Sequence, residues 1–327
     1  MAGQPRLKIA IADYGHTGAL KSGAVAIRGV EAEFDQVNPI IGAFRRMVRD
    51  LEFDVCEMAP TTYMIARALG APFEAIPVFL MRRFHHSGFV VRPDSGIKVP
   101  KDLEGKQVGV RAYSVTTGVW TRGIFVNEYG LDSSKVTWVV DDEEHVTQLK
   151  LPPNVVHAPP GKSLVDMMAA GEIQAAFTGN AGIGRAGSPT GDWKASAQPS
   201  TETYPELIKN PEEAEAQWFK RTGIYPIHGL VVVRSEVLWK HPFVARALYD
   251  AFVEAKKPYT AHLQGKAGDS ADDKKYRGLM PLVGDPLPYG MKNNLTSIEA
   301  MLTYGLQQNL IPKRMTLEEA FVDPEKA

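Results

Sequence analysis

The chain has 327 residues, 44% of them hydrophobic, and a formal net charge of −1 from 37 basic and 38 acidic residues. This length fits two domains of ordinary size, and the composition is that of a folded chain. A nearly neutral chain has no bulk field for holding nucleic acid or an anionic membrane, so any preference for anions must come from local groups. The single cysteine, Cys56, excludes an internal disulfide.

The N-terminal region favours a cytoplasmic protein. Its apolar stretch, residues 7–12, is interrupted by Lys8 and is too short for the core of a signal peptide. No apolar run approaches the length of a transmembrane helix. A chain with one cysteine also fits a reducing compartment.

Short apolar runs alternate with helical patterns along the chain. In chain order, we expect strands at residues 7–12, 53–58, 75–81, 88–92, 107–110, 136–140, 174–178 and 227–233. We expect helices after Asn38-Pro39, from Thr61 or Thr62 to Gly70, and at 117–129, 163–170, from Pro242, and at 295–310. Residues 179–205 are expected to form a loop, and residues 269–289 a long surface excursion.

Strands that alternate with helices predict an α/β fold, with parallel sheets and helices on both faces. Ligands of such sheets bind beyond the C-terminal ends of the strands. Those positions are residues 13–21, 57–62, 82–87, 111–117, 141–145 and 179–182, and they include Asn180.

The loop after the strand at 107–110 is the most informative of these segments. Arg111, Tyr113 and Ser114 lead into a helix that starts at Thr116 and Thr117. Free backbone N–H groups and the helix dipole make such a start an anion seat. Simple N-capping explains the same residues equally well.

Residues 57–63 have the same layout in the first half of the chain. Thr62 opens the helix there, so a ligand with two carboxylates, or a carboxylate and a hydroxyl, would suit the two turns together. Glu57 could accept a proton from a phenol, or it could serve as a cap or in an ion pair.

Residues 82–87 concentrate basic groups at the end of a strand. If the chain stays extended, Arg82 and His86 share one face, and His85 lies on the other. Arginine can bind a carboxylate with two hydrogen bonds, and histidine can pass a proton near neutral pH. A solvated basic strand end is the alternative.

Three further features have structural explanations beside functional ones. His16 lies in the glycine-bracketed loop 14–18, where a mobile surface histidine is expected, and His228 begins a strand, where a packed histidine is expected. Residues 141–145 could hold a metal ion, but a solvated acidic turn is expected because adjacent side chains seldom converge on one ion. No dinucleotide-binding, Walker or nucleophile-elbow motif is present.

Several segments together resemble the 4,5-dihydroxyphthalate decarboxylase family, a branch of the type II periplasmic-binding-protein superfamily. They are residues 53–58, 76–79, 84–87, 102–110, 113–123 and 221–228, and the similarity extends from about residue 7 to residue 256. Two positions depart from the family pattern: His85 stands where an arginine is common, and Gly229 where a histidine is common.

The resemblance implies a two-lobed type II periplasmic-binding-protein-like α/β fold with a ligand cleft between the lobes. Residues 1–90 and 228–327 would form lobe 1, and residues 91–227 lobe 2. The implied activity is non-oxidative removal of one carboxylate from a dihydroxylated phthalate. Such a reaction needs no organic cofactor, because the substrate ring supplies both the electron push and the electron sink, and no metal site is expected.

The resemblance also implies roles for the residues named above. His86 would be the acid, and His16 or His228 would orient or deprotonate the ring hydroxyl. The groups that contact the substrate would be Arg82, Glu57, Thr62, His85, Arg111, Tyr113, Ser114, Thr116, Thr117 and Asn180. The expected partner is a small aromatic carboxylate, with no nucleic acid and no membrane; monomeric and homo-oligomeric states stay open.

Two other functions remain open from the sequence. A non-catalytic solute-binding protein for an aromatic or small carboxylate would bind without turnover. Another enzyme on the same scaffold, such as one that makes a pyrimidine precursor, would need iron or a sacrificed histidine, and the sequence shows no clear signature of either.

Overall fold

The computed structural model describes residues 4–184, 204–265 and 270–324. The chain divides into two compact units. Unit 1 comprises Met1–Arg83, Ile227–Ile298 and Met315–Ala327, and unit 2 comprises Phe84–Pro226 and Glu299–Arg314. The expected boundaries at residues 90/91 and 227/228 therefore differ from the observed ones, and residues 299–314 belong to the second unit rather than the first.

Unit 1 is built on a five-stranded sheet in the order β2-β1-β3-β10-β4. Its strands are β1 (Arg6–Ala10), β2 (Glu31–Phe34), β3 (Val55–Met58), β4 (Phe73–Arg82) and β10 (Ile227–Arg234). β1 is parallel to β2 and β3, whereas β10 runs antiparallel to β3 and β4. The expectation of a purely parallel sheet is thus corrected, because the chain re-enters this sheet through β10 in the opposite direction.

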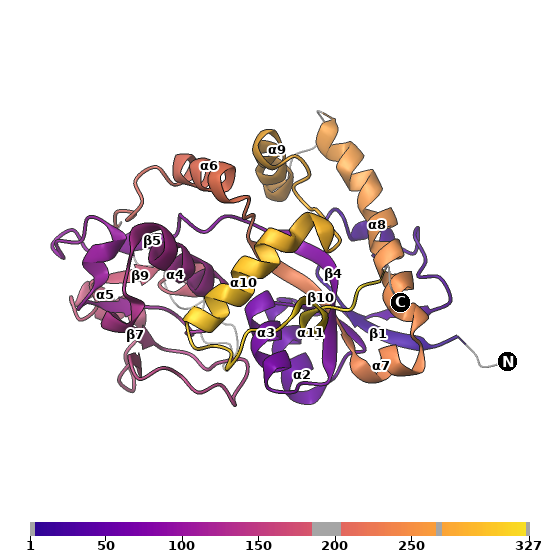
Figure 1. Cartoon of the computed structure of the whole chain (residues 1–327), viewed down its shortest axis with the longest axis horizontal. Coiled ribbons are helices and arrows are strands. Elements are labelled where there is room, and N and C mark those ends of the chain that lie inside the picture. Colours follow the sequence, from indigo (N-terminus) through magenta and orange to yellow (C-terminus); the bar gives the residue numbers. More distant parts are fainter. Residues whose placement is uncertain (1–3, 185–203, 266–269, 325–327) are drawn as a thin grey trace. The chain divides into compact units, whose positions relative to one another are not determined.

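Helices cover both faces of the unit 1 sheet (Figure 1). Alternate residues of β4 explain this: Ile76, Val78 and Leu80 pack into a core with α8 (Phe243–Gln264), whereas Phe73 contacts Tyr63 of α3 (Pro60–Ala68) on the other face. The other helices of this unit are α1 (Gly18–Lys21), α2 (Ile41–Asp50), α7 (Ser235–Lys240), α9 (Ala271–Val283) and α11 (Leu317–Ala320); a 3₁₀ turn (Lys292–Asn294) leads into α10 (Leu295–Gln307).

Unit 2 has its own five-stranded sheet, in the order β5-β9-β6-β7-β8. Its strands are β5 (Phe89–Val91), β6 (Gln107–Gly109), β7 (Thr137–Val140), β8 (Val155–His157) and β9 (Ala175–Phe177). All neighbours are parallel except β5 and β9. The helices are α4 (Thr116–Tyr129), α5 (Leu164–Ala169) and α6 (Pro211–Thr222), with 3₁₀ turns at Pro100–Leu103, Ser133–Lys135 and Gly179–Ala181.

Two helix predictions need correction. The expected surface excursion at 269–289 contains α9, which begins at a capping box where the Ser270 hydroxyl accepts from Asp273 N and the Asp273 carboxylate accepts from Ser270 N. Asp269 itself lies outside the described residues. Asn38-Pro39 is not the start of a helix: its peptide bond is cis, and Ile40 is the N-cap residue of α2.

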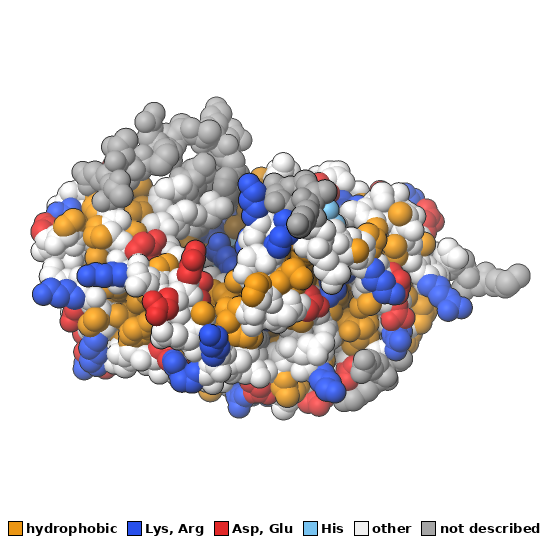
Figure 2. All heavy atoms as spheres, turned by 90° about the horizontal axis from the view of Figure 1, so that it is seen from above, with side chains coloured by type: hydrophobic (Ala, Val, Ile, Leu, Met, Phe, Trp, Pro, Cys, Tyr) orange, Lys and Arg blue, Asp and Glu red, His pale blue; other side chains and the backbone are white. Residues whose placement is uncertain are grey.

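Among the described residues, no helix combines the length and the hydropathy that a membrane crossing requires. On the face shown in Figure 2, acidic and basic side chains are interspersed. This distribution agrees with the formal net charge of −1.

Candidate functional site

The C-terminal ends of β1 and β3 bring Tyr14 and Glu57 together in unit 1. The Tyr14 hydroxyl donates a hydrogen bond of 2.7 Å to Glu57 Oε1, and the backbone N–H of Ala12 donates to Glu57 Oε2 at 3.1 Å. Glu57 is buried, and burial raises the pKa of its carboxyl to about 7. A substantial fraction of Glu57 therefore carries a proton at neutral pH, which suits an acid for catalysis.

His16 is buried directly beside this pair. Its ring lies nearly parallel to that of Tyr14, with centroids 5.1 Å apart, and the Tyr259 ring packs against it at 5.7 Å. Burial lowers the pKa of His16 to about 3, and the Leu80 backbone opposes this effect. The expected mobile surface histidine is thus a buried, neutral imidazole that packs against Tyr14.

Three basic side chains of unit 1 are coupled electrostatically. Burial lowers the pKa of His228, and the positive charges of Arg83 and Lys275 lower it further. Burial lowers the pKa of Lys275, the neighbouring Asp272 raises it, and Arg83 lowers it; the Lys275 ammonium lies over the Tyr276 ring at 4.5 Å. Such mutual destabilisation of positive charge is relieved by a negatively charged ligand.

Two other unit 1 candidates are deeply buried. The Arg82 guanidinium donates hydrogen bonds to Asn294 Oδ1 and to Ser297 Oγ, and it lies 5.7 Å from the Phe79 ring. These contacts hold Arg82 within its own unit. Thr62 is buried in the first turn of α3, which begins at Pro60 rather than at a threonine.

In unit 2, a carboxylate of the chain itself occupies the loop before α4, next to the helix start where the sequence predicts an anion seat. Glu144 accepts hydrogen bonds from the backbone N–H of Tyr113 at 2.6 Å, from that of Ser114 at 3.2 Å, and from the Ser114 hydroxyl. α4 begins at Thr116, as the sequence indicated, and Thr116 and Thr117 are buried. The segment at 110–116 can therefore hold a carboxylate, because it already does.

Arg111 and Tyr113 are held by other groups of unit 2. Arg111 Nη1 lies 3.2 Å from Asp142 Oδ2, and both side chains are buried. The Tyr113 ring packs against the Arg122 guanidinium at 4.0 Å, and its hydroxyl donates to the Gln308 carbonyl at 3.4 Å. Asn180 is exposed in the 3₁₀ turn after β9.

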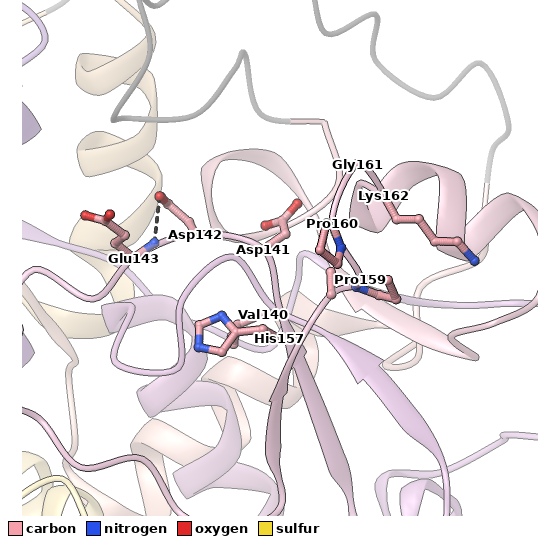
Figure 3. Close-up of a pocket in the computed structure, with 10 residues that line it drawn as sticks. Val140, Asp141, Asp142, Glu143, His157, Pro159, Pro160, Gly161 and Lys162 are labelled. Carbon is pink, nitrogen blue, oxygen red and sulfur yellow. Dashed lines mark hydrogen bonds between the residues drawn. The ribbon is translucent and has the colours of Figure 1, made fainter.

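The acidic turn at 141–145 is only partly solvated, because Asp142 and His145 are buried. Figure 3 shows Asp141, Asp142 and Glu143 at the end of β7, at the rim of a cavity of about 300 Å³ that His157 and Lys162 also line. Asp142 Oδ1 accepts from the Glu143 N–H at 2.8 Å. Within the described ranges, no group of three or more His, Cys, Asp or Glu residues could hold a metal ion.

The rings of His85 and His86 pack against different tryptophans. The His85 ring lies parallel to that of Trp120, with centroids 6.5 Å apart, and its carbonyl accepts from the Thr121 hydroxyl at 3.0 Å. The His86 ring packs against Trp218 at 5.2 Å, and burial lowers its pKa to about 4. Glu215 lies beside it, with 4.0 Å between Glu215 Oε1 and His86 Nδ1, and burial raises the pKa of Glu215 to about 7.

The structure does not bring His86 to the anion seat of its own unit. His86 lines a small cavity with Glu128 and Tyr129 of the last turn of α4. Thr116 and Thr117 begin the same helix, whose 14 residues span about 20 Å at about 1.5 Å per residue. The sequence placed Arg82 and His86 on one face of an extended strand. The strand β4 ends at Arg82, so the alternation of side chains on which this expectation rests does not reach His86.

The sequence analysis missed several residues of the candidate sites in unit 1 and unit 2. Tyr14 and Lys275 in unit 1 and Glu144, Glu215 and Trp218 in unit 2 were not singled out. The position of Tyr14, directly after a strand parallel to the one that carries Glu57, was a usable signal. Lys275 could not be found once its helix had been interpreted as a surface excursion.

Comparison with known proteins agrees with the resemblance seen in the sequence. A family model described as an ABC transporter, phosphonate, periplasmic substrate-binding protein matches residues 29–256. A 4,5-dihydroxyphthalate decarboxylase from Comamonas testosteroni is 31% identical over 329 residues, which cover 97% of this chain and 96% of that protein. The chain belongs to the 4,5-dihydroxyphthalate decarboxylase family.

A second member of the 4,5-dihydroxyphthalate decarboxylase family, from Pseudomonas putida, is 33% identical over 227 residues, or 65% of this chain and 81% of that protein. Among solved structures, a Candida albicans protein with the generic periplasmic binding protein fold superposes with a TM-score of 0.52 at 14% identity, covering 98% of this chain and 96% of that one. The expected two-lobed type II periplasmic-binding-protein fold is confirmed.

Proposed function

We propose that this protein catalyses the non-oxidative decarboxylation of a hydroxylated aromatic carboxylate such as 4,5-dihydroxyphthalate. The observation that carries the proposal is the buried Tyr14–Glu57 pair of unit 1, with a carboxyl whose pKa burial raises to about 7. Family membership supports the reaction class, since both curated relatives carry the name of this decarboxylase.

The chemistry requires a proton at the ring carbon that bears the departing carboxylate. Loss of the proton from the hydroxyl para to that carbon pushes an electron pair into the ring. The carbon then takes a proton, the carbon–carbon bond breaks, and carbon dioxide leaves. The bonding pair restores the aromatic ring and the phenolate, and the phenolate takes its proton back. The net change is one proton consumed and one carbon dioxide released, with the ring itself as the electron sink.

Burial shifts the pKa values of the proposed acid and the proposed base of unit 1 in opposite directions. Because burial raises the pKa of Glu57 and lowers the pKa of His228, the carboxyl keeps its proton at a pH where the imidazole is already neutral. Glu57 would give its proton to the ring carbon, and the Tyr14 hydroxyl would orient that carboxyl through its hydrogen bond, because burial and the neighbouring Glu57 raise the pKa of Tyr14 and make its hydroxyl a poor acid. His228 would accept the phenol proton, and His16 would fix the Tyr14 ring by stacking.

Positive charge near His228 suits the anionic substrate. Arg83 and Lys275 would bind a carboxylate and stabilise the phenolate as it forms. This assignment replaces His86 as the acid, because burial makes the imidazole of His86 neutral at neutral pH. In unit 2, the seat of Tyr113 and Ser114 would take a substrate carboxylate only after Glu144 has left it.

The test is carbon dioxide release from 4,5-dihydroxyphthalate by the purified protein. Phthalate, which lacks the ring hydroxyls, is the matched control. It should release no carbon dioxide, because it has no hydroxyl that can supply an electron pair to the ring. The reaction should survive treatment with a chelator, since the substrate supplies its own electron sink. No release from 4,5-dihydroxyphthalate or from monohydroxylated phthalates would contradict the proposal.

A non-catalytic solute-binding role is the second candidate, and the match to a periplasmic substrate-binding family model favours it. It predicts that a carboxylate ligand binds and is recovered chemically unchanged. Incubation with a stoichiometric amount of 4,5-dihydroxyphthalate, followed by mass spectrometry of the small molecule released on denaturation, separates the two functions.

A further inference from the structure

The carboxylate of Glu144 lies in a turn of unit 2 that offers it three hydrogen-bond donors. The backbone N–H groups of Tyr113 and Ser114 and the Ser114 hydroxyl all donate to this one carboxylate. Successive backbone N–H groups of a turn form a concave site for an anion. The Tyr113–Ser114 turn therefore binds Glu144 as it would bind a free carboxylate.

Arg122 of α4 places a buried positive charge behind this turn. Its side chain is fully buried; Nε donates to Gln308 Oε1 at 2.8 Å, and Nη2 donates to the Tyr113 carbonyl. The rings of Tyr113 and Trp138 pack against the guanidinium at 4.0 Å and 5.1 Å. All these partners are neutral, and Nη1 has no hydrogen-bond partner among the described residues. An arginine stays protonated in a protein, and a buried charge without a counter-ion is unfavourable.

A single peptide group connects the charge of Arg122 to the turn. Its carbonyl, which belongs to Tyr113, accepts from Arg122 Nη2, and its N–H, which belongs to Ser114, donates to Glu144 Oε2 at 3.2 Å. A hydrogen bond from a cation polarises the peptide group and makes its N–H a stronger donor. Burial lowers the pKa of Arg122, and Tyr113 and the Glu144 carboxylate raise it. The anion in the turn and the cation behind it thus stabilise each other.

The Glu144 side chain is placed so that it can leave the turn. It is partly exposed, and it lies in the irregular chain between β7 and β8. Rotation of such a side chain is fast and disturbs neither strand. The donors lie directly under the carboxylate, at 2.6 Å in the case of Tyr113 N, so its departure uncovers them.

We propose that the Tyr113–Ser114 turn is a carboxylate-binding site for which Glu144 is an internal competitor, and that Arg122 supplies the charge of this site through one peptide group. A ligand carboxylate displaces Glu144 and takes the same three donors. A neutral analogue cannot do so, because it does not replace the charge of Glu144 opposite Arg122. Arg122 is a positioning residue, since the ligand never contacts it. That the displacing carboxylate belongs to the decarboxylase substrate rests on the proposed function, whereas the competition itself does not.

Benzoate, a ring with one carboxylate and no hydroxyl, tests the site without the reaction. The full chain is titrated with benzoate, and the amide ¹H–¹⁵N resonances of Tyr113 and Ser114 report binding at the turn. A tethered carboxylate competes at a high effective concentration, so Glu144→Ala should bind benzoate at least about tenfold more tightly than the unmodified protein. Glu143→Ala, at the exposed neighbouring position, is the matched control and should leave the affinity unchanged.

The charge of Arg122 is tested in the Glu144→Ala protein. Benzamide, which has the shape of benzoate but no charge, should bind about tenfold more weakly, because charge-assisted hydrogen bonds are the stronger ones. Arg122→Met should weaken benzoate binding by a similar factor with little effect on benzamide, and Arg122→Lys, which keeps the charge, should weaken it less. If Arg122→Met does not fold, the comparison of benzoate with benzamide provides the same test.

Three results would overturn the proposal. They are unshifted Tyr113 and Ser114 resonances when benzoate is added to Glu144→Ala, equal benzoate affinities of Glu144→Ala and the unmodified protein, and equal affinities of Glu144→Ala for benzoate and benzamide. None of them bears on the proposed decarboxylation, which is decided by carbon dioxide release from 4,5-dihydroxyphthalate.

Discussion

Replacing Glu57 with glutamine tests the buried carboxyl on which the proposed chemistry depends. The folded protein raises the pKa of Glu57 from 4.5 to about 7. The fold therefore favours the protonated carboxyl, and this contribution to stability is complete below pH 4.5 and is lost as the pH rises through about 7. At about 1.4 kcal/mol for each pKa unit, the loss amounts to about 3 kcal/mol.

The amide of the Glu57→Gln variant cannot ionise, so the variant should lack this pH dependence. The free energy of unfolding, measured by urea denaturation from pH 4.5 to pH 8, should fall by about 3 kcal/mol more in the unmodified protein than in Glu57→Gln. The difference between the stability curves of the two proteins gives the contribution of Glu57 alone. Other titrating groups, such as Glu215, whose pKa is also raised, contribute equally to both curves.

Glu52→Gln provides the control of opposite sign. Hydrogen bonds from Arg46 and Lys8 lower the pKa of Glu52 to about 2. Its contribution to stability is therefore present above pH 4.5 and is lost only as the pH falls towards 2. Glu52→Gln should parallel the unmodified protein between pH 5 and pH 8. If Glu57→Gln did so as well, to within about 1 kcal/mol, the argument that burial holds a proton on Glu57 would be refuted.

Three further outcomes are expected. Tyr14→Phe removes the hydroxyl that bonds Glu57, and kcat for carbon dioxide release should drop by about 10²-fold or more while the protein stays folded by circular dichroism. Lys275→Gln should raise KM about tenfold with a smaller effect on kcat, whereas Lys274→Gln, at an exposed position of the same helix, should change neither. Glu144→Ala leaves two backbone N–H groups and one hydroxyl without their carboxylate, so it should cost about 1–3 kcal/mol in thermal unfolding, and added sulfate should restore part of the loss.

Most strands and several long helices could be predicted from the sequence, because their apolar periodicity is set by residues adjacent in the chain, whereas β2, β8 and α6 were not predicted. The helix α4 was predicted to within one residue of its start, and it ends at Gly130 with a φ of 66°, the left-handed conformation that glycine adopts readily. The helix α9 was missed because it is polar and contains Gly278 and Pro281, although Ser270 and Asp273 have the spacing of a capping box.

The site could be predicted only in part, because its geometry depends on which strands become neighbours. For Glu57 the sequence left open a proton acceptor, a cap and an ion-pair partner, and its hydrogen bond to Tyr14 could not be foreseen because it spans 43 positions in the chain. Glu144 was interpreted as part of a solvated turn, and nothing local shows that its carboxylate occupies the loop before α4. The prediction that Arg82 and His86 share one face assumed that the strand β4 continues past Arg82. The strand ends at Arg82.

The shifted pKa values of Glu57 and His228 bear on how a binding-protein fold can become catalytic. Burial raises the pKa of Glu57 to about 7 and lowers the pKa of His228, so below neutral pH most molecules carry both groups uncharged before a substrate arrives. A fold optimised for stability alone would avoid both groups, because each is unfavourable once it ionises. Transfer of one proton from Glu57 and one proton to His228 would leave a carboxylate and an imidazolium, and Lys275 and Arg83 would hold the anionic ring near His228. Exchanging the two groups for neutral isosteres, Glu57→Gln with His228→Asn, should therefore stabilise the fold at pH 8 and abolish turnover; a double variant that is less stable and still releases carbon dioxide would contradict this account.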